Sequence, residues 1–281
     1  MKINPINNHF VADVDGIDIG TISDEDFEAV YQAWLQFGVL RLHDQPLDEE
    51  SLQRFSRRFG PLEERPMGRL PAEAKAKIKN RYVTQLSNIV ENGKPIGGLG
   101  NSEANWHSDM TYVDTPPPAS ILLGIEIPEV GGNTYFADQQ AAYEALPEAL
   151  RTRAETLSIK HDAAHTSVGS LRPGFEAFDD PRQAPGAVHP IIRTHEETGK
   201  KVLYLGRREW AFIPGLSLDD SETLLDELWS YAATDSNTWG QQWQPGDLII
   251  WDNRRVLHRR DDFPADSRRL MKRCQVLARS I

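Results

Sequence analysis

Short runs of apolar residues, separated by turn residues, recur along the chain and predict strands. Such runs cover 119–127, 134–137, 248–252 and 270–278, and a turn rich in proline or glycine precedes each of the first three. Strands of this length bounded by turns are typical of sandwiches and barrels. Apolar residues at helical spacing predict a few helices, one that starts at Ser23-Asp24 and reaches Leu35, and others over 48–59, 139–154 and 219–233.

Many short strands with a few surface helices predict a mostly β fold, a double-stranded β-helix or jelly roll of the cupin-like kind. A length of 281 residues suits one such domain with helical insertions, so we expect a single domain over 1–281. Residues 65–105 are rich in proline and glycine. Long loops inside compact domains are usually functional, and we expect a loop-rich lid over the site here.

Charge and composition narrow the class of partner. The net charge of −11 argues against nucleic acid and anionic membranes. No apolar run is long enough to span a bilayer, and no secretory signal is visible. The single cysteine, Cys274, falls in a predicted strand and fits a reducing cytoplasm. We therefore expect a cytoplasmic protein that acts on a small molecule, and leave homo-oligomers open.

The segment Trp106-His107-Ser108-Asp109 carries the first candidate chemistry. On a strand, His107 and Asp109 would point to the same face because side chains alternate. With His258 arriving from a distant strand, they form a 2-His-1-carboxylate set, which binds non-haem Fe(II) and leaves adjacent positions open. Zinc is an alternative in principle, but the zinc hydrolase pattern H-E-x-x-H is absent.

Further elements follow the H-x-D pattern at regular distances. Thr134 lies 27 residues after His107, and Arg269 lies 11 residues after His258. With these residues in this order and at these distances, the chain resembles the taurine dioxygenase / 2,4-dichlorophenoxyacetate dioxygenase family of Fe(II)- and 2-oxoglutarate-dependent oxygenases. Matching flanks include Thr115-Pro116-Pro117, Gly131-Gly132-Asn133 and Trp251-Asp252-Asn253-Arg254.

The resemblance implies a role for each matched residue. His107, Asp109 and His258 would ligate iron, while Thr134 and Arg269 would hold the distal carboxylate of 2-oxoglutarate, with O₂ as the second co-substrate. A guanidinium and a hydroxyl suit that task, since they grip a carboxylate through several hydrogen bonds. Arg273 matches the position that binds the acidic group of the primary substrate in the taurine enzyme.

The predicted reaction is hydroxylation of a small anionic substrate with release of succinate and CO₂. The resemblance favours this outcome, since related halogenases lack the carboxylate that Asp109 provides. Glu103 is a candidate partner for a substrate ammonium, or else an exposed loop acid. Two alternatives stay open: desaturation or oxidative decarboxylation of an amino-acid derivative, and a non-catalytic jelly roll that binds a metal or anion. We expect none of His161, His165, His189 and His195 to bind the metal.

Overall fold

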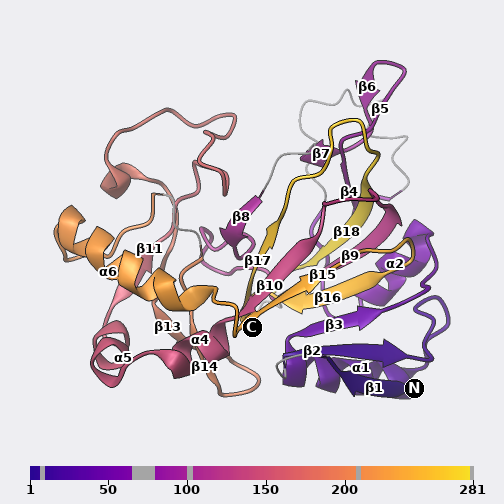
Figure 1. Ribbon diagram of the computed structural model, residues 1–281, viewed down its shortest axis with the longest axis horizontal. Coiled ribbons are helices and arrows are strands. Elements are labelled where there is room, and N and C mark those ends of the chain that lie inside the picture. The colour runs from indigo at the N-terminus through magenta and orange to yellow at the C-terminus, as the bar shows by residue number, and fades with distance from the viewer. Residues whose placement is uncertain (7–9, 65–79, 100–103, 207–209, 279–281) are drawn as a thin grey trace.

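Two β-sheets face each other in the computed structural model, which describes residues 1–6, 10–64, 80–99, 104–206 and 210–278 (Figure 1). The larger sheet has the order β1 (Lys2–Pro5), β2 (Val11–Asp15), β3 (Val39–Leu42), β16 (Leu248–Asp252), β9 (Ala119–Glu126), β18 (Leu270–Val276), β4 (Thr84–Ser87), β7 (Gly98–Leu99). The smaller has the order β15 (Thr238–Gln241), β10 (Thr134–Asp138), β17 (Val256–Arg260), β8 (Ala104–His107). The prediction of a mostly β, double-sheet jelly roll is confirmed.

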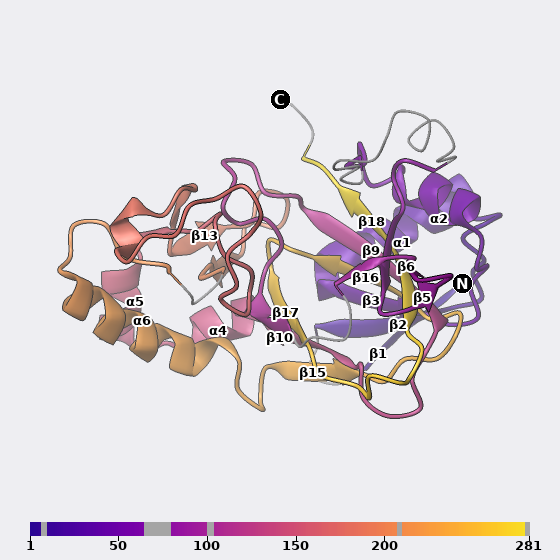
Figure 2. The same cartoon turned by 90° about the horizontal axis from the view of Figure 1, so that it is seen from above.

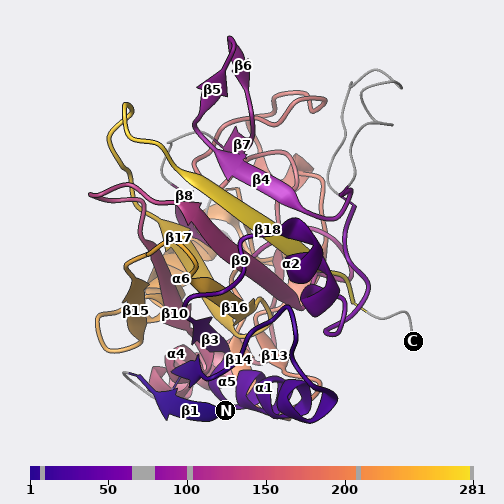
Figure 3. The ribbon, with the colours of Figure 1, turned by 90° about the vertical axis from the view of Figure 1, so that its right-hand side faces the viewer.

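Period-two alternation explains how the larger sheet buries both faces. In β16, Leu248 and Ile250 point to an outer core, whereas Ile249 and Trp251 point to the core between the sheets. The outer core is closed by α1 (Asp24–Phe37) and α2 (Glu49–Ser56). Figure 3 shows β16, β9 and β18 side by side at the centre of this sheet.

The outer face of the smaller sheet is covered by helices that form a third core. These are α4 (Gln139–Ala145), α5 (Glu148–Ala154) and α6 (Leu218–Ala232), which lie on the opposite side of the molecule from α1 and α2 (Figure 2). The single helix predicted over 139–154 is wrong. Pro147 interrupts it, because proline has no amide hydrogen to continue the hydrogen-bond ladder. Within the described ranges, no helix has the length and apolar character needed to cross a membrane.

The remaining strands form short two-stranded sheets away from the central pair. They are β5 (Val90–Glu91) with β6 (Lys94–Pro95), β11 (Ser158–Lys160) with β12 (Val188–Pro190), and β13 (Ile192–Thr194) with β14 (Lys201–Leu203).

The segment expected to be a loop-rich lid contains a strand of the larger sheet. β4 pairs antiparallel with β18 over four residues, so the loop prediction is wrong there. Residues 65–79 and 100–103 lie outside the described part, and with them Glu103. Covering of the site by this segment stays a prediction.

Candidate metal centre

Two histidines from distant parts of the sequence face each other across neighbouring strands. His107 ends β8, and the antiparallel register places it directly opposite His258 of β17. Directly opposed residues bring their side chains close on one face of a sheet. The ring centroids are accordingly 4.2 Å apart, with an angle of 46° between the rings. Both residues are buried at the inner face of the smaller sheet.

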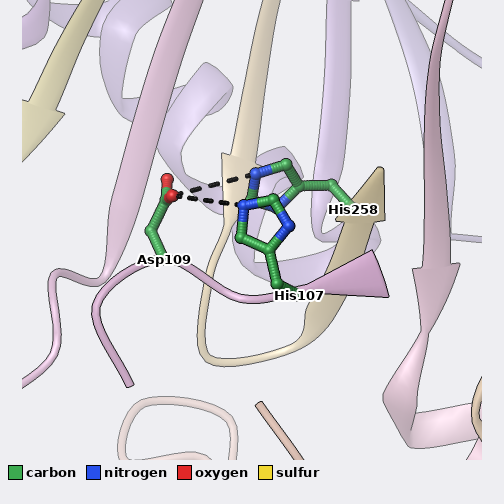
Figure 4. Close-up of side chains that lie close together, drawn as sticks. All are labelled: His107, Asp109 and His258. Carbon is green, nitrogen blue, oxygen red and sulfur yellow. Dashed lines mark ion pairs between the residues drawn. The ribbon is translucent and has the colours of Figure 1, made fainter. Parts of the chain in front are cut away.

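Asp109 joins the two histidines from a turn, not from a strand. The predicted shared strand face is wrong, because β8 ends at His107 and the chain turns at once. The Ser108 hydroxyl donates to the carbonyl of Val256 at 2.9 Å, and Met110 adopts a left-handed conformation with φ of 50°. The turn directs the Asp109 carboxylate back towards both rings (Figure 4).

The three side chains form one compact set of ligand atoms. Oδ1 of Asp109 lies 3.8 Å from Nε2 of His107 and 3.8 Å from Nε2 of His258. All three ligand atoms lie within 4.8 Å of one another, and no other such group of histidine, cysteine or acidic residues occurs in the part of the chain that is described. The residues predicted as metal ligands are therefore brought together.

Protonation in this set favours a divalent cation. Burial alone would raise the pKa of Asp109, but Arg273, the two histidines and a hydrogen bond from Ser120 outweigh it and hold the pKa well below its ordinary range. Nδ1 of His107 lies 2.7 Å from the carbonyl oxygen of Asn105. Since a carbonyl only accepts, Nδ1 carries the proton and Nε2 offers its lone pair to a metal.

The other four histidines predicted to be outside the metal set lie elsewhere. His195 contacts Asp252 at 2.9 Å, and His165 contacts Asp162 at 2.8 Å. His189 is hydrogen-bonded to the carbonyl of Val113. Through these contacts the three histidines stabilise the surrounding structure. None of the four, His161 included, belongs to the metal-ligand group found among the described residues.

Thr134 is buried at the start of β10, on the same inner face as Phe136 and His258. The indole Nε1 of Trp243 donates to its hydroxyl oxygen at 3.0 Å. An indole has only a donor to offer, so the threonine hydroxyl keeps its own hydrogen for another acceptor. Trp243 was not found from the sequence. Its only signal there is an aromatic residue in a polar segment, Gln241-Gln242-Trp243-Gln244.

Arg269 is a buried cation that forms no ion pair or side-chain hydrogen bond with the described residues. Only 5% of the residue is exposed. Burial, and then the nearby charge of Arg260, lower its pKa to about 9, although the charge of Asp261 opposes that shift. Gly132 lets the guanidinium approach, since a Cβ there would lie 3.1 Å from Nε. A carboxylate ligand would pair with this buried guanidinium through charge-assisted hydrogen bonds and so offset the cost of its burial.

Arg269 lies just before β18, whereas Arg273 lies within that strand. The pairing of β18 with β9 is irregular between Leu270 and Met271, so simple alternation does not relate the two arginines. Arg273 shares the inner face of β18 with Met271, and its Nη1 lies 3.4 Å from Oδ2 of Asp109. The predicted anion-binding residue thus reaches the metal-ligand set.

Glu63 is a charged neighbour that sequence reasoning missed. Its backbone amide donates to the carbonyl of Gln275 at 2.9 Å, which aligns it with the end of β18. Burial raises its pKa, while the charge of Arg273 opposes that shift. No motif marks this residue in the sequence, because its closeness to Arg273 depends on pairing across the fold.

The double sheet, the compact set of two histidines and one carboxylate, and the buried guanidinium of Arg269 define a class of enzyme. They are the features of Fe(II)- and 2-oxoglutarate-dependent dioxygenases, in which a metal and a 2-oxo dicarboxylate are held side by side.

Comparison with known proteins agrees with this class. The family model described as "Taurine catabolism dioxygenase TauD, TfdA family" matches residues 2–275, and the chain belongs to this family. It is 33% identical to the (S)-phenoxypropionate/alpha-ketoglutarate-dioxygenase of Sphingobium herbicidovorans, over 96% of this chain and 92% of that protein. It is 32% identical to the alpha-ketoglutarate-dependent 2,4-dichlorophenoxyacetate dioxygenase of a Burkholderia species, over 99% and 96%.

A solved structure supports the same conclusion. The crystal structure of AAD-2 in complex with Mn(II) and N-oxalylglycine superposes with a TM-score of 0.79 at 27% identity, covering 99% of this chain and 98% of that one. The protein is thus a dioxygenase that depends on Fe(II), 2-oxoglutarate and O₂. The prediction of an enzyme with these cofactors is confirmed.

Proposed function

We propose that this dioxygenase hydroxylates a small organic anion. The observation that carries the proposal is the position of Arg273, whose Nη1 lies 3.4 Å from Oδ2 of Asp109 while 22% of its side chain stays exposed. The relatives support an anionic substrate, because two of them are named for phenoxypropionate and 2,4-dichlorophenoxyacetate, both carboxylates. The proposed assignments are iron for His107, Asp109 and His258, 2-oxoglutarate for Thr134 and Arg269, and substrate for Arg273.

The distal carboxylate of 2-oxoglutarate has two complementary donors in this proposal. The Thr134 hydroxyl has its oxygen engaged by Trp243, so its hydrogen points elsewhere. The Arg269 guanidinium is positively charged and has no hydrogen-bond partner among the described residues. A planar guanidinium binds a carboxylate through two parallel hydrogen bonds. Fixing this end of the molecule directs its 2-oxo acid end towards the metal ligands.

The guanidinium of Arg273 has hydrogen-bond donors that the described residues use only in part, and these could bind the substrate anion. Among the described residues, Nη1 is the atom of Arg273 that has a hydrogen-bond partner, and 22% of the side chain is exposed. The remaining donors suit a carboxylate, sulfonate, sulfate or phosphonate group. Binding there would set the carbon to be hydroxylated beside the metal-ligand set, which is how an enzyme gains from orientation.

The reaction that follows from these assignments balances as substrate C–H, 2-oxoglutarate and O₂ giving substrate C–OH, succinate and CO₂. Bound iron and 2-oxoglutarate supply the oxidising chemistry, and the protein supplies binding and orientation. Asp109 stays ionised and keeps its place on the metal, as its lowered pKa supports. Arg269 would hold 2-oxoglutarate and Arg273 the substrate, so that each organic anion has its own guanidinium.

Composition supports a cytoplasmic enzyme with a small-molecule partner. The net charge of −11 disfavours nucleic acid and anionic membranes as partners. The single cysteine, Cys274, is buried in β18, and burial raises its pKa to about 11. The prediction that Cys274 lies in a strand is confirmed, and its burial and raised pKa argue against a reactive thiol.

The test is succinate formation from 2-oxoglutarate in the presence of Fe(II) and ascorbate, across carboxylates, sulfonates, sulfate esters and phosphonates. The proposal expects succinate and a hydroxylated product in equal amounts with at least one class of anion, and little succinate with matched neutral amides or esters. Equal activity on anions and neutral analogues would contradict the role of Arg273. An unsaturated or decarboxylated product would favour the alternative outcomes, and binding without turnover would favour a non-catalytic protein.

A further inference from the structure

The two oxygens of the Asp109 carboxylate lie in different surroundings. Oδ1 is 3.8 Å from Nε2 of both histidines, whereas Oδ2 accepts a hydrogen bond from Ser120 Oγ at 3.0 Å. Nη1 of Arg273 also approaches Oδ2, at 3.4 Å. One oxygen therefore faces the metal-ligand set, and the protein holds the other.

A directed chain of hydrogen bonds lies behind Ser120. The indole Nε1 of Trp251 donates to Oδ1 of Asn253 at 2.7 Å, and Nδ2 of Asn253 donates to Oγ of Ser120 at 3.1 Å. Because an indole can only donate, it fixes which end of the amide faces it. The amide hydrogens then point to Ser120, whose hydroxyl accepts there and has its single hydrogen left for Asp109.

The chain is built into the centre of the larger sheet. Trp251 of β16 pairs directly with Ser120 of β9, and the backbone amide of Asn253 donates to the carbonyl of Pro118 at 2.8 Å. The exposed fractions of Trp251, Asn253 and Ser120 lie between 0% and 2%. The Trp251 ring also packs against His258, with centroids 4.9 Å apart. One indole thus contacts one metal ligand through its ring and orients another through its N–H.

We propose that Trp251, Asn253 and Ser120 form a positioning relay that keeps Asp109 bound to the metal through Oδ1 alone. The proposal rests on the iron site proposed above. Ser120 is fully buried, so an incoming substrate cannot take its hydroxyl. Arg273 is partly exposed and engages Oδ2 at a longer distance, so a substrate anion can draw it away. The relay then holds Oδ2 during turnover, while Arg273 is the exchangeable donor.

The two donors to Oδ2 predict opposite effects on metal binding. Removal of the Ser120 hydroxyl frees the carboxylate to rotate, and loss of a group that orients a metal ligand typically weakens metal affinity about 10- to 100-fold. Removal of Arg273 takes a positive charge away from a cation site, so metal affinity should stay the same or increase. A merely structural role for Ser120 would give neither this contrast nor a change in the coordination of the metal.

The experiment measures Mn(II) and Co(II) binding to metal-free Ser120→Ala, Trp251→Phe and Arg273→Gln by calorimetry, and records the Co(II) absorption spectrum of each. Ser56→Ala is the matched control, because Ser56 is an equally buried serine that donates to a backbone carbonyl in α2. We expect weaker binding and an altered Co(II) spectrum for Ser120→Ala, a smaller change of the same kind for Trp251→Phe, and neither effect for Ser56→Ala.

Two results would overturn the relay. One is a Ser120→Ala affinity within threefold of the parent with an unchanged Co(II) spectrum. The other is an Arg273→Gln variant that loses as much metal affinity as Ser120→Ala. Asp109→Ala separates the relay from the iron site itself. If that variant binds Co(II) as well as the parent protein, the iron site is wrong, whatever Ser120→Ala shows.

Discussion

Replacement of Arg269 by methionine tests the 2-oxoglutarate site. It should also leave the ligand-free protein at least as stable as the parent, which a simple loss of packing would not do. Methionine keeps most of the length and the apolar contact with Phe263, whose ring centroid lies 5.9 Å from the guanidinium carbon. It removes the charge and the donors that the distal carboxylate of 2-oxoglutarate would use. Charge-assisted hydrogen bonds contribute about 1.5–3 kcal/mol each. Loss of two, about 3–6 kcal/mol, predicts about 100- to 20,000-fold weaker binding of 2-oxoglutarate.

The same change should not destabilise the ligand-free protein. Lowering the pKa of Arg269 from 12.5 to about 9 corresponds to roughly 5 kcal/mol against the charged form, to order of magnitude. Replacing a buried, unpaired charge by an apolar side chain of similar size removes this cost. We therefore expect the thermal midpoint of ligand-free Arg269→Met to equal or exceed that of the parent.

The assay combines succinate production against 2-oxoglutarate concentration with thermal melting, with and without N-oxalylglycine in the presence of Mn(II). Arg268→Met is the control, since Arg268 is an exposed neighbour that pairs with Glu126 at 2.6 Å. We expect a raised KM for 2-oxoglutarate and a lost ligand-induced shift of the thermal midpoint for Arg269→Met alone. A KM within threefold of the parent, or a ligand-free midpoint lowered by many degrees, would refute this expectation.

Three further predictions follow from other parts of the site. Trp243→Phe removes the bond that orients the Thr134 hydroxyl, so KM for 2-oxoglutarate should rise about two- to tenfold with kcat nearly unchanged; an unchanged KM would contradict the role of the indole. Arg273→Gln should raise KM for the anionic substrate at least tenfold and leave KM for 2-oxoglutarate within threefold of the parent. Steady-state kinetics in which each of the two compounds is varied in turn will measure both values. Equal effects on the two KM values would be inconsistent with separate anion sites. Metal affinity should show no separate transition near pH 4, about the ordinary carboxyl pKa, because the lowered pKa keeps Asp109 ionised there; such a transition in calorimetric Mn(II) titrations would show that the carboxyl has its ordinary pKa.

Local patterns were sufficient for the apolar central strands and for naming the candidate ligands. The alternation in β16 and the turn before β10 can be read within a few residues, because the face of a strand depends on nearest neighbours. His107, Asp109 and His258 were found from residue type and spacing. The structure brings them together through the register of β8 with β17, which the sequence does not state.

Features that depend on contacts across the fold could not be found in this way. Asp109 reaches the histidines because β8 ends at His107, and the end of a strand is set by its pairing partner. The strand β4 is short and polar, and only its pairing with β18 identifies it. Ser120 does leave a signal, since it is a lone polar residue among apolar neighbours in 119–123, but its target Asp109 is visible only in the structure.

We propose that three separated side chains hold one metal beside a 2-oxo dicarboxylate anchored by Arg269. The decisive experiment is anomalous diffraction from crystals grown with Mn(II) and 2-oxoglutarate. We expect one manganese peak bonded to Nε2 of His107, Oδ1 of Asp109 and Nε2 of His258, with the distal carboxylate of 2-oxoglutarate on Thr134 and Arg269. A manganese peak away from these three atoms, or a 2-oxoglutarate carboxylate that leaves Arg269 unpaired, would contradict it.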